Sequence, residues 1–156
     1  MVKAYYISSI ESLMRDYEEM KCLADFHNAR VMINLNKRSY EKLAFQNLLK
    51  VTNQIMNKDY KNVKKSYNSV VGQFSNDNEK KWIIDIDNKD IGFVTKVVNE
   101  LNNLKCSIIP IIYGTITTKN GYHLITSPFN RLMADTGVLT GLDIHKDNPT
   151  ILYVNN

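Results

Sequence analysis

The chain has 156 residues, of which 44% are hydrophobic and 23% charged, and its formal net charge is +4. These values are typical of one globular domain and exclude a long disordered tail, and no apolar stretch resembles a membrane span or a signal peptide. The positive charge favours polyanionic partners such as nucleotides and nucleic acid. We therefore expect a soluble cytoplasmic protein of a bacterium or a phage-infected cell, with no membrane contact and with free thiols at Cys22 and Cys106.

The first elements alternate helix and strand. Helical periodicity over residues 5–26 predicts an amphipathic helix with a break near Ser8 and Ser9. Residues 30–35 are typical of a strand. The positions of the first helix expected to face inward are Tyr6, Ile10, Leu13, Met14, Tyr17, Met20 and Leu23.

Two more helices are predicted before a polar linker. Ser39 is the expected N-cap of a helix that runs to about residue 56, and a lysine-rich helix is expected over 58–71. The polar residues 75–81 form the linker. The inward-facing positions of the helix after Ser39 are expected to be Leu43, Ala44, Leu48, Val51 and Ile55.

The second half predicts a compact α/β pattern. It begins with an expected strand over 82–87 and a helix over 91–102, whose buried positions are Val94, Val97, Val98 and Leu101. A strand over 107–117, which contains Pro110, and a strand over 122–126 are expected to form a hairpin around a turn at 119–121. A short helix near 128–135 and a strand over 150–154 complete the pattern. This β-α-β-β-α-β order is typical of ferredoxin-like or RNA-recognition-motif-like folds. We expect a single domain over 1–156, with the N-terminal helix and the strand–helix unit in 1–75 and the core in 82–156.

The segment 82–87 carries two carboxylates, at Asp85 and Asp87, within an apolar strand. Strand side chains alternate between faces, so these two project from one side, roughly 7 Å apart. Like charges on a buried strand are costly unless cations compensate them, and oxygen ligands suit Mg²⁺ or Mn²⁺. The alternative is that one aspartate caps the next helix and the other lies at the wet end of the strand.

His123 begins a strand directly after the Gly121 turn. A neutral imidazole there can donate to a phosphate oxygen or ligate a metal. A half-exposed hairpin histidine without a task is the alternative. Further along, Asp143 and Asp147 are both candidates for a third carboxylate; Asp143 follows an apolar residue, whereas Asp147 precedes Asn-Pro and is typical of a turn.

These motifs resemble the archaeo-eukaryotic primases and primase-polymerases. That family has three motifs in this order. The first is an aspartate pair among hydrophobic residues, here Asp85 and Asp87, and the second is a small residue two positions before a histidine, here Gly121 and His123. The third is a hydrophobic residue followed by an aspartate, here Asp143. Gly stands at 121 where Ser is commoner. The resemblance implies a minimal, phage-type member in which Asp85, Asp87 and Asp143 bind two Mg²⁺ or Mn²⁺ ions and His123 contacts the triphosphate of the incoming nucleotide.

Nucleotidyl transfer also needs fixed cations near the phosphates. Lys119 lies on the turn before His123, and Lys37 and Arg38 follow the first strand. Arg38 is the better candidate of these last two because guanidinium binds phosphate through two parallel hydrogen bonds. A solvated turn cation is the alternative for each.

A lysine-rich stretch is a candidate for binding the nucleic-acid backbone, and its lysines are Lys58, Lys61, Lys64 and Lys65. On an α-helix the last three fall on one side, within reach of successive phosphates. An ordinary solvated helix face is the alternative.

The sequence thus predicts a metal-dependent nucleotidyltransferase that uses nucleoside triphosphates on a single-stranded DNA or RNA template, alongside other replication proteins. Two alternatives stay open: a non-catalytic nucleic-acid-binding module on the same fold, and a phage-encoded protein that binds or inhibits a host protein. The choice of ribo- or deoxynucleotide, de novo priming and the oligomeric state are not determined by the sequence.

Overall fold

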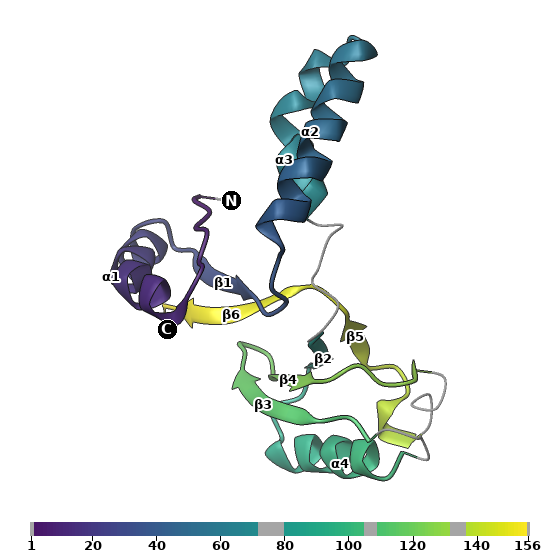
Figure 1. Cartoon of the computed structure of the whole chain (residues 1–156). Coiled ribbons are helices and arrows are strands. Elements are labelled where there is room, and N and C mark those ends of the chain that lie inside the picture. Colours follow the sequence, from purple (N-terminus) through teal and green to yellow (C-terminus); the bar gives the residue numbers. More distant parts are fainter. Residues whose placement is uncertain (1, 72–79, 105–108, 132–136, 156) are drawn as a thin grey trace. The chain divides into compact units, whose positions relative to one another are not determined.

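The computed structural model describes residues 2–71, 80–104, 109–131 and 137–155, which form a mixed α+β fold. Within these ranges there are four α-helices and two antiparallel sheets (Figure 1). The chain divides into two compact units, Met1–Asn34 with Pro149–Asn156, and Leu35–Asn148. The predicted α/β class is confirmed.

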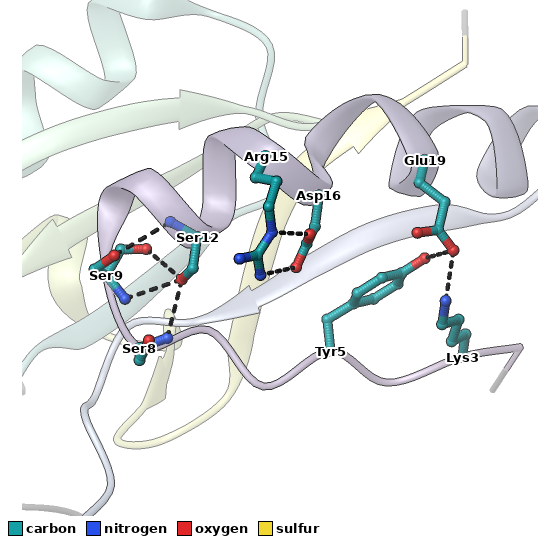
Figure 2. A network of polar contacts seen from close by, with 8 residues as sticks. All are labelled: Lys3, Tyr5, Ser8, Ser9, Ser12, Arg15, Asp16 and Glu19. Atoms are coloured by element: carbon teal, nitrogen blue, oxygen red, sulfur yellow. Dashed lines mark hydrogen bonds and ion pairs between the residues drawn. The ribbon is translucent and has the colours of Figure 1, made fainter.

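The first unit combines helix α1 (Ile10–Phe26) with the antiparallel pair β1 (Arg30–Asn34) and β6 (Pro149–Val154). The helix begins after Ser9, whose side chain accepts a hydrogen bond from the Ser12 N–H, while the Ser12 hydroxyl oxygen accepts one from the Ser9 N–H (Figure 2). The predicted start at residue 5 was therefore wrong, because this reciprocal cap fixes the first turn. The predicted break is the true start of the helix.

Residues before this cap run outside the helix and bind to its side. Lys3 Nζ and Tyr5 Oη both donate to Glu19 Oε1, as Figure 2 shows. Of the apolar positions predicted to face inward, Met20 is buried, but Ile10 and Met14 are exposed. Periodicity identified the helix correctly and overestimated how much of its apolar stripe is covered.

The last strand corrects the predicted topology. Residues 150–154 were expected to be the last strand of the β-α-β-β-α-β core, whereas β6 pairs with β1, from Arg30 opposite Val154 to Asn34 opposite Pro149. The strand that joins the aspartate strand is instead the short β5 (Asp143–His145). An apolar run predicts a strand but does not name its neighbour, because pairing is decided by contacts between distant parts of the chain.

The second unit begins with a helical hairpin. Helix α2 (Tyr40–Met56) starts after its N-cap Ser39, as predicted, and packs against the 3₁₀-helix η1 (Tyr60–Lys65) and helix α3 (Ser66–Val71); Figure 1 shows α2 and α3 side by side. The single α-helix predicted over 58–71 is thus in part a 3₁₀-helix. Of the predicted inward stripe of α2, Leu43 is buried but Leu48 is 63% exposed, because α3 and η1 cover a different side.

A four-stranded antiparallel sheet forms the rest of this unit, in the order β3-β4-β2-β5. Its remaining strands are β2 (Trp82–Ile86), β3 (Ile112–Thr117) and β4 (Tyr122–Thr126), and helix α4 (Ile91–Asn102) packs on one face. Ile84, Ile86 and Leu124 meet Val97 and Leu101 there with no exposed surface. This cluster is the main core of the unit.

Most predicted bounds in this half agree with the structure. The β3–β4 hairpin and the helix over 91–102 are confirmed. Of the strand predicted over 107–117, residues 109–111 lie before β3, which begins at Ile112, and Pro110 has no N–H to donate to a ladder. Residues 107–108, like Cys106, lie outside the described residues. Residues 75–79 of the predicted linker and 132–136 of the predicted short helix lie outside the described residues.

A buried asparagine joins the hairpin to the sheet. Asn36 is 4% exposed, and its Nδ2 donates to the carbonyl oxygens of Lys81 and Lys146. Its Oδ1 accepts from the Lys81 N–H at 2.7 Å. The chain entering α2 is therefore fixed to the start of β2 and the end of β5.

Candidate functional site

Three residues singled out from separate motifs lie in one row across the sheet. In the strand register, Asp85 on β2 is directly opposite His123 on β4 and directly opposite Asp143 on β5. Side chains of directly opposed residues point to the same face and lie about 5 Å apart at Cβ. The row Asp143–Asp85–His123 is therefore a continuous polar group on three neighbouring strands, which we call the central row.

The central row lies on the face opposite α4. Ile84 and Ile86 flank Asp85 in β2 and point into the core with α4, so Asp85 points the other way. The next aspartate, Asp87, lies one residue past the end of β2 and is exposed. The alternation of side chains predicted from the sequence thus separates an apolar face of the sheet from the face that carries Asp85, Asp143 and His123.

Burial makes His123 a neutral group near physiological pH. Its side chain is 14% exposed, and its Nε2 lies 3.6 Å from Asp85 Oδ1. Loss of solvent is the largest influence and lowers the pKa of His123 below its ordinary value; the charge of His145 lowers it further, while Asp85 and Asp87 oppose the shift. In a neutral imidazole one ring nitrogen is a hydrogen-bond donor and the other an acceptor.

His145 is a fourth member of the group, and no sequence motif had indicated it. It lies two residues beyond Asp143 on β5, opposite Ile83, and therefore on the same face as Asp85. Its Nε2 is 4.0 Å from Asp85 Oδ2. The Asp-x-His spacing would have indicated it had residues 143–145 been predicted as a strand.

Of the two candidates for the third carboxylate, only Asp143 faces the central row by register. Asp147 instead forms a bidentate ion pair with Arg38, with distances of 3.1 Å to Nη1 and 2.6 Å to Nη2. Asn36 Nδ2 also donates to Asp147 Oδ1. Arg38, predicted as a nucleotide ligand, thus has its guanidinium fork against a carboxylate of its own chain.

The predicted lysines lie in different places. Lys119 is exposed on the turn between β3 and β4, which touches the end of β2: a Cβ on Gly121 would lie 1.9 Å from the Ile86 carbonyl oxygen. Lys37 is exposed just before α2. Three of the remaining lysines belong to η1 and Lys58 precedes it in a left-handed conformation, so all four lie on the helical hairpin; they are Lys58, Lys61, Lys64 and Lys65.

The central row and His145 carry carboxylates and imidazoles, which are common ligands of metal ions and phosphates. Among the described residues, no three His, Cys, Asp or Glu side chains converge closely enough to hold an ion as they stand. Asp85 and Asp143 are nevertheless directly opposed anions, an arrangement that destabilises a sheet unless a cation lies between them. Mg²⁺ needs only one or two protein carboxylates when substrate phosphates supply its other ligands, so the residues fit such an ion.

Comparison with known proteins adds no relative: no family model, no curated protein and no solved structure matches the chain. Within the described part of the chain, no helix has the length and apolar character needed to cross a membrane.

Proposed function

We propose that the protein is a metal-dependent nucleotidyltransferase of the primase-polymerase type, which joins nucleoside triphosphates on a single-stranded template. The observation that carries the proposal is the central row. Asp85, His123 and Asp143 come from segments up to 58 positions apart in sequence, and the register of β4, β2 and β5 aligns them.

The strand order supports the same proposal. All neighbours in β3-β4-β2-β5 are antiparallel, and α4 connects β2 to β3 on the face away from the central row. An RNA-recognition-motif-like sheet would have such an order, with β5 rather than residues 150–154 as its last strand.

In this proposal each side chain has a defined task. Asp85 and Asp143, with Asp87 at the end of β2, hold Mg²⁺ or Mn²⁺, which would activate the attacking 3′-hydroxyl and stabilise the leaving pyrophosphate. The neutral His123 donates its N–H to a phosphate oxygen of the incoming nucleotide. Lys119, on the turn beside the end of β2, neutralises phosphate charge.

The helical hairpin supplies the proposed template contact. Lys61 and Lys64 are three residues apart on η1, and side chains at this spacing share one side of a 3₁₀-helix. They would contact neighbouring backbone phosphates, with Lys65 and Lys58 at the margin. Binding of this kind weakens steeply as salt rises.

A thermal-shift experiment tests the proposed site directly. The midpoint of unfolding is measured for wild type, Asp85→Asn and the control Asp16→Asn, with and without Mn²⁺ and a nucleoside triphosphate. Asp16 is a matched control because its carboxylate pairs with Arg15 on the surface of α1. A ligand that binds only the folded state raises the midpoint of unfolding. At a ligand concentration of a hundred times the dissociation constant, it adds about 2.7 kcal/mol to the free energy of unfolding.

We expect the rise in wild type and Asp16→Asn but not in Asp85→Asn. Wild type and Asp16→Asn should then extend a primed template in a metal-dependent way, and Asp85→Asn should not. Equal rises of the midpoint in all three proteins would show that the nucleotide does not bind at the central row. Binding of single-stranded DNA without any nucleotide effect would favour the non-catalytic nucleic-acid-binding module instead.

A further inference from the structure

The helical hairpin holds a cavity that has no part in the proposed nucleotidyl transfer. It has a volume of about 400 Å³ and is lined by residues of α2, of the turn after it and of α3, which packs against α2 (Figure 1). Small-molecule sites have volumes of about 300–1,000 Å³, so this one suits a ligand the size of a nucleobase or a nucleoside. The residues of the central row do not line it.

Side-chain amides dominate the lining of this hairpin cavity. They belong to Gln46, Asn53, Gln54 and Asn57. Gln46, Asn53 and Asn57 share one side of the helix, because they are spaced seven and then four residues apart. Gln54 Oε1 accepts a hydrogen bond from the Ser66 hydroxyl, whereas within the described residues the other three amides have no hydrogen-bond partner from the protein. Each of the three therefore presents a donor and an acceptor side by side to a ligand.

The other lining residues suit a flat heterocycle with a phosphate attached. Leu49 and Val70 are apolar, and Val70 is only 2% exposed, so a ring can rest its faces on them. Lys50 is half-buried, and its Nζ donates to Ser69 Oγ. An ammonium group has three donors, so two are left to bind a phosphate oxygen.

Among the nucleobases, the amides favour adenine. Asn and Gln form two hydrogen bonds with the N6 donor and the N7 acceptor of this base, which match the oxygen and the NH₂ of one amide. The cavity also adjoins the proposed phosphate contacts of η1. Asp59 lines the cavity and is the N-cap of η1, and Lys61 follows it by two residues.

We propose that the hairpin cavity binds adenine, whose hydrogen-bonding edge is held by the amides of Gln46, Asn53 and Asn57. The base belongs either to a single-stranded nucleic acid or to a free adenine nucleotide, since both present the same edge. The inference goes beyond the proposed function and does not rest on it, because the cavity and the central row share no residue.

The test compares the full chain as wild type, Asn53→Ala and the control Asn68→Ala. Asn68 is an exposed asparagine of α3 that does not line the cavity. Alanine has the highest helix propensity, so neither change weakens its helix, and circular dichroism establishes that each variant is folded. Fluorescence anisotropy measures binding of labelled oligodeoxyadenylate, oligothymidylate and an abasic strand of equal length, and calorimetry measures binding of AMP. All titrations contain a chelator, so that a metal site plays no part.

We expect wild type and Asn68→Ala to bind one adenine ligand at least about fivefold more tightly than Asn53→Ala does. A preference for oligodeoxyadenylate over the other two strands that disappears in Asn53→Ala identifies adenine within a strand as the ligand. An affinity for AMP that falls in Asn53→Ala identifies the free nucleotide.

An adenine ligand that binds wild type and Asn53→Ala equally, or no adenine preference in wild type with either ligand, would overturn the proposed cavity site. The fate of the nucleotidyltransferase is separate, because its test is the thermal shift with Mn²⁺ and nucleotide in wild type and Asp85→Asn. Loss of that shift would leave adenine binding in chelator unchanged, and loss of adenine binding would leave the shift unchanged.

Discussion

The two faces of the four-stranded sheet are made by the same strands and have opposite characters. Toward α4, Ile84, Ile86 and Leu124 are completely buried. Away from α4, Asp85 and His123 are partly exposed and face each other at a distance longer than a hydrogen bond. The fully buried core of these strands thus lies on the first face, and their charged and imidazole side chains lie on the second.

The second face is not wholly polar. Ile83 and Ile125, which neighbour the central row on the same side, are also buried. Charges beside an apolar surface are less well hydrated, which strengthens their attraction for a cation or a phosphate. This surrounding explains why His123 is held neutral while its neighbours on the row are acidic.

The largest expected effect belongs to the apolar face. Leu101→Ala removes a fully buried side chain of α4 and should lower the free energy of unfolding by about 2–5 kcal/mol. Leu48→Ala makes the same chemical change on the exposed side of α2 and should stay within about 0.5 kcal/mol. Urea unfolding measures both, and equal losses would contradict the placement of the core.

The β3–β4 turn, where it lies against the end of β2, should be the next most sensitive to substitution. A Cβ at residue 121 would lie 1.9 Å from the carbonyl oxygen of Ile86 and 2.7 Å from the N–H nitrogen of Asn88, both main-chain atoms. Gly121→Ser should therefore cost about 1–3 kcal/mol, in spite of the resemblance to a family in which Ser is commoner here. Asn120→Ala, in the same turn and exposed, is the control. If both variants are as stable as wild type, the main chain of the turn can shift to accept a side chain at residue 121.

On the polar face we expect a small change of the opposite sign. Asp143→Asn removes one of two directly opposed anions, so without metal it should raise stability by about 0.2–1 kcal/mol. The same variant should lose the midpoint rise produced by Mn²⁺ and nucleotide. Thermal unfolding in chelator and in ligand measures the two effects, and a clear loss of stability in chelator would mean that Asp143 has a structural partner instead.

The smallest effect concerns pH. Because burial lowers the pKa of His123 in the folded state, the unfolded chain binds a proton more readily. Stability should be unaffected by this group above its ordinary pKa of 6.5, fall as the pH drops below that value, and level off below the folded pKa. Urea midpoints between pH 8 and 5 should show this fall in wild type and a reduced one in His123→Asn; identical profiles would mean that His123 titrates normally.

Local sequence predicted the elements well where capping and periodicity act within a few residues. The helix after Ser39 begins where its cap predicts, the helix over 91–102 has the bounds that periodicity predicts, and β2 and β4 have nearly the predicted bounds. The helix expected from residue 5 failed at its start because the Ser9–Ser12 cap is a specific interaction that periodicity does not detect. The inward positions predicted for α2 were wrong in part for another reason. An apolar face is a requirement for burial but does not supply an element that covers it.

The candidate site shows the same division. The motifs selected Asp85, His123 and Asp143, but only strand register could align them, and it also brought in His145, which no motif had indicated. Conversely, Arg38 had the right chemistry for a phosphate and lies against Asp147 instead. The roles of these residues stay predictions for the experiments described above.

By itself the sequence determined most of the helices and strands, though not β5, and which strand carries alternating isoleucine and aspartate, because these depend on neighbours within a few residues. The tertiary structure alone decided that residues 149–154 pair with β1 and that β5 takes the place beside β2. It also decided which charged groups meet, Asp85 with two histidines and Asp147 with Arg38. Pairing between distant strands depends on the free energy of the whole arrangement, which no short stretch of sequence contains.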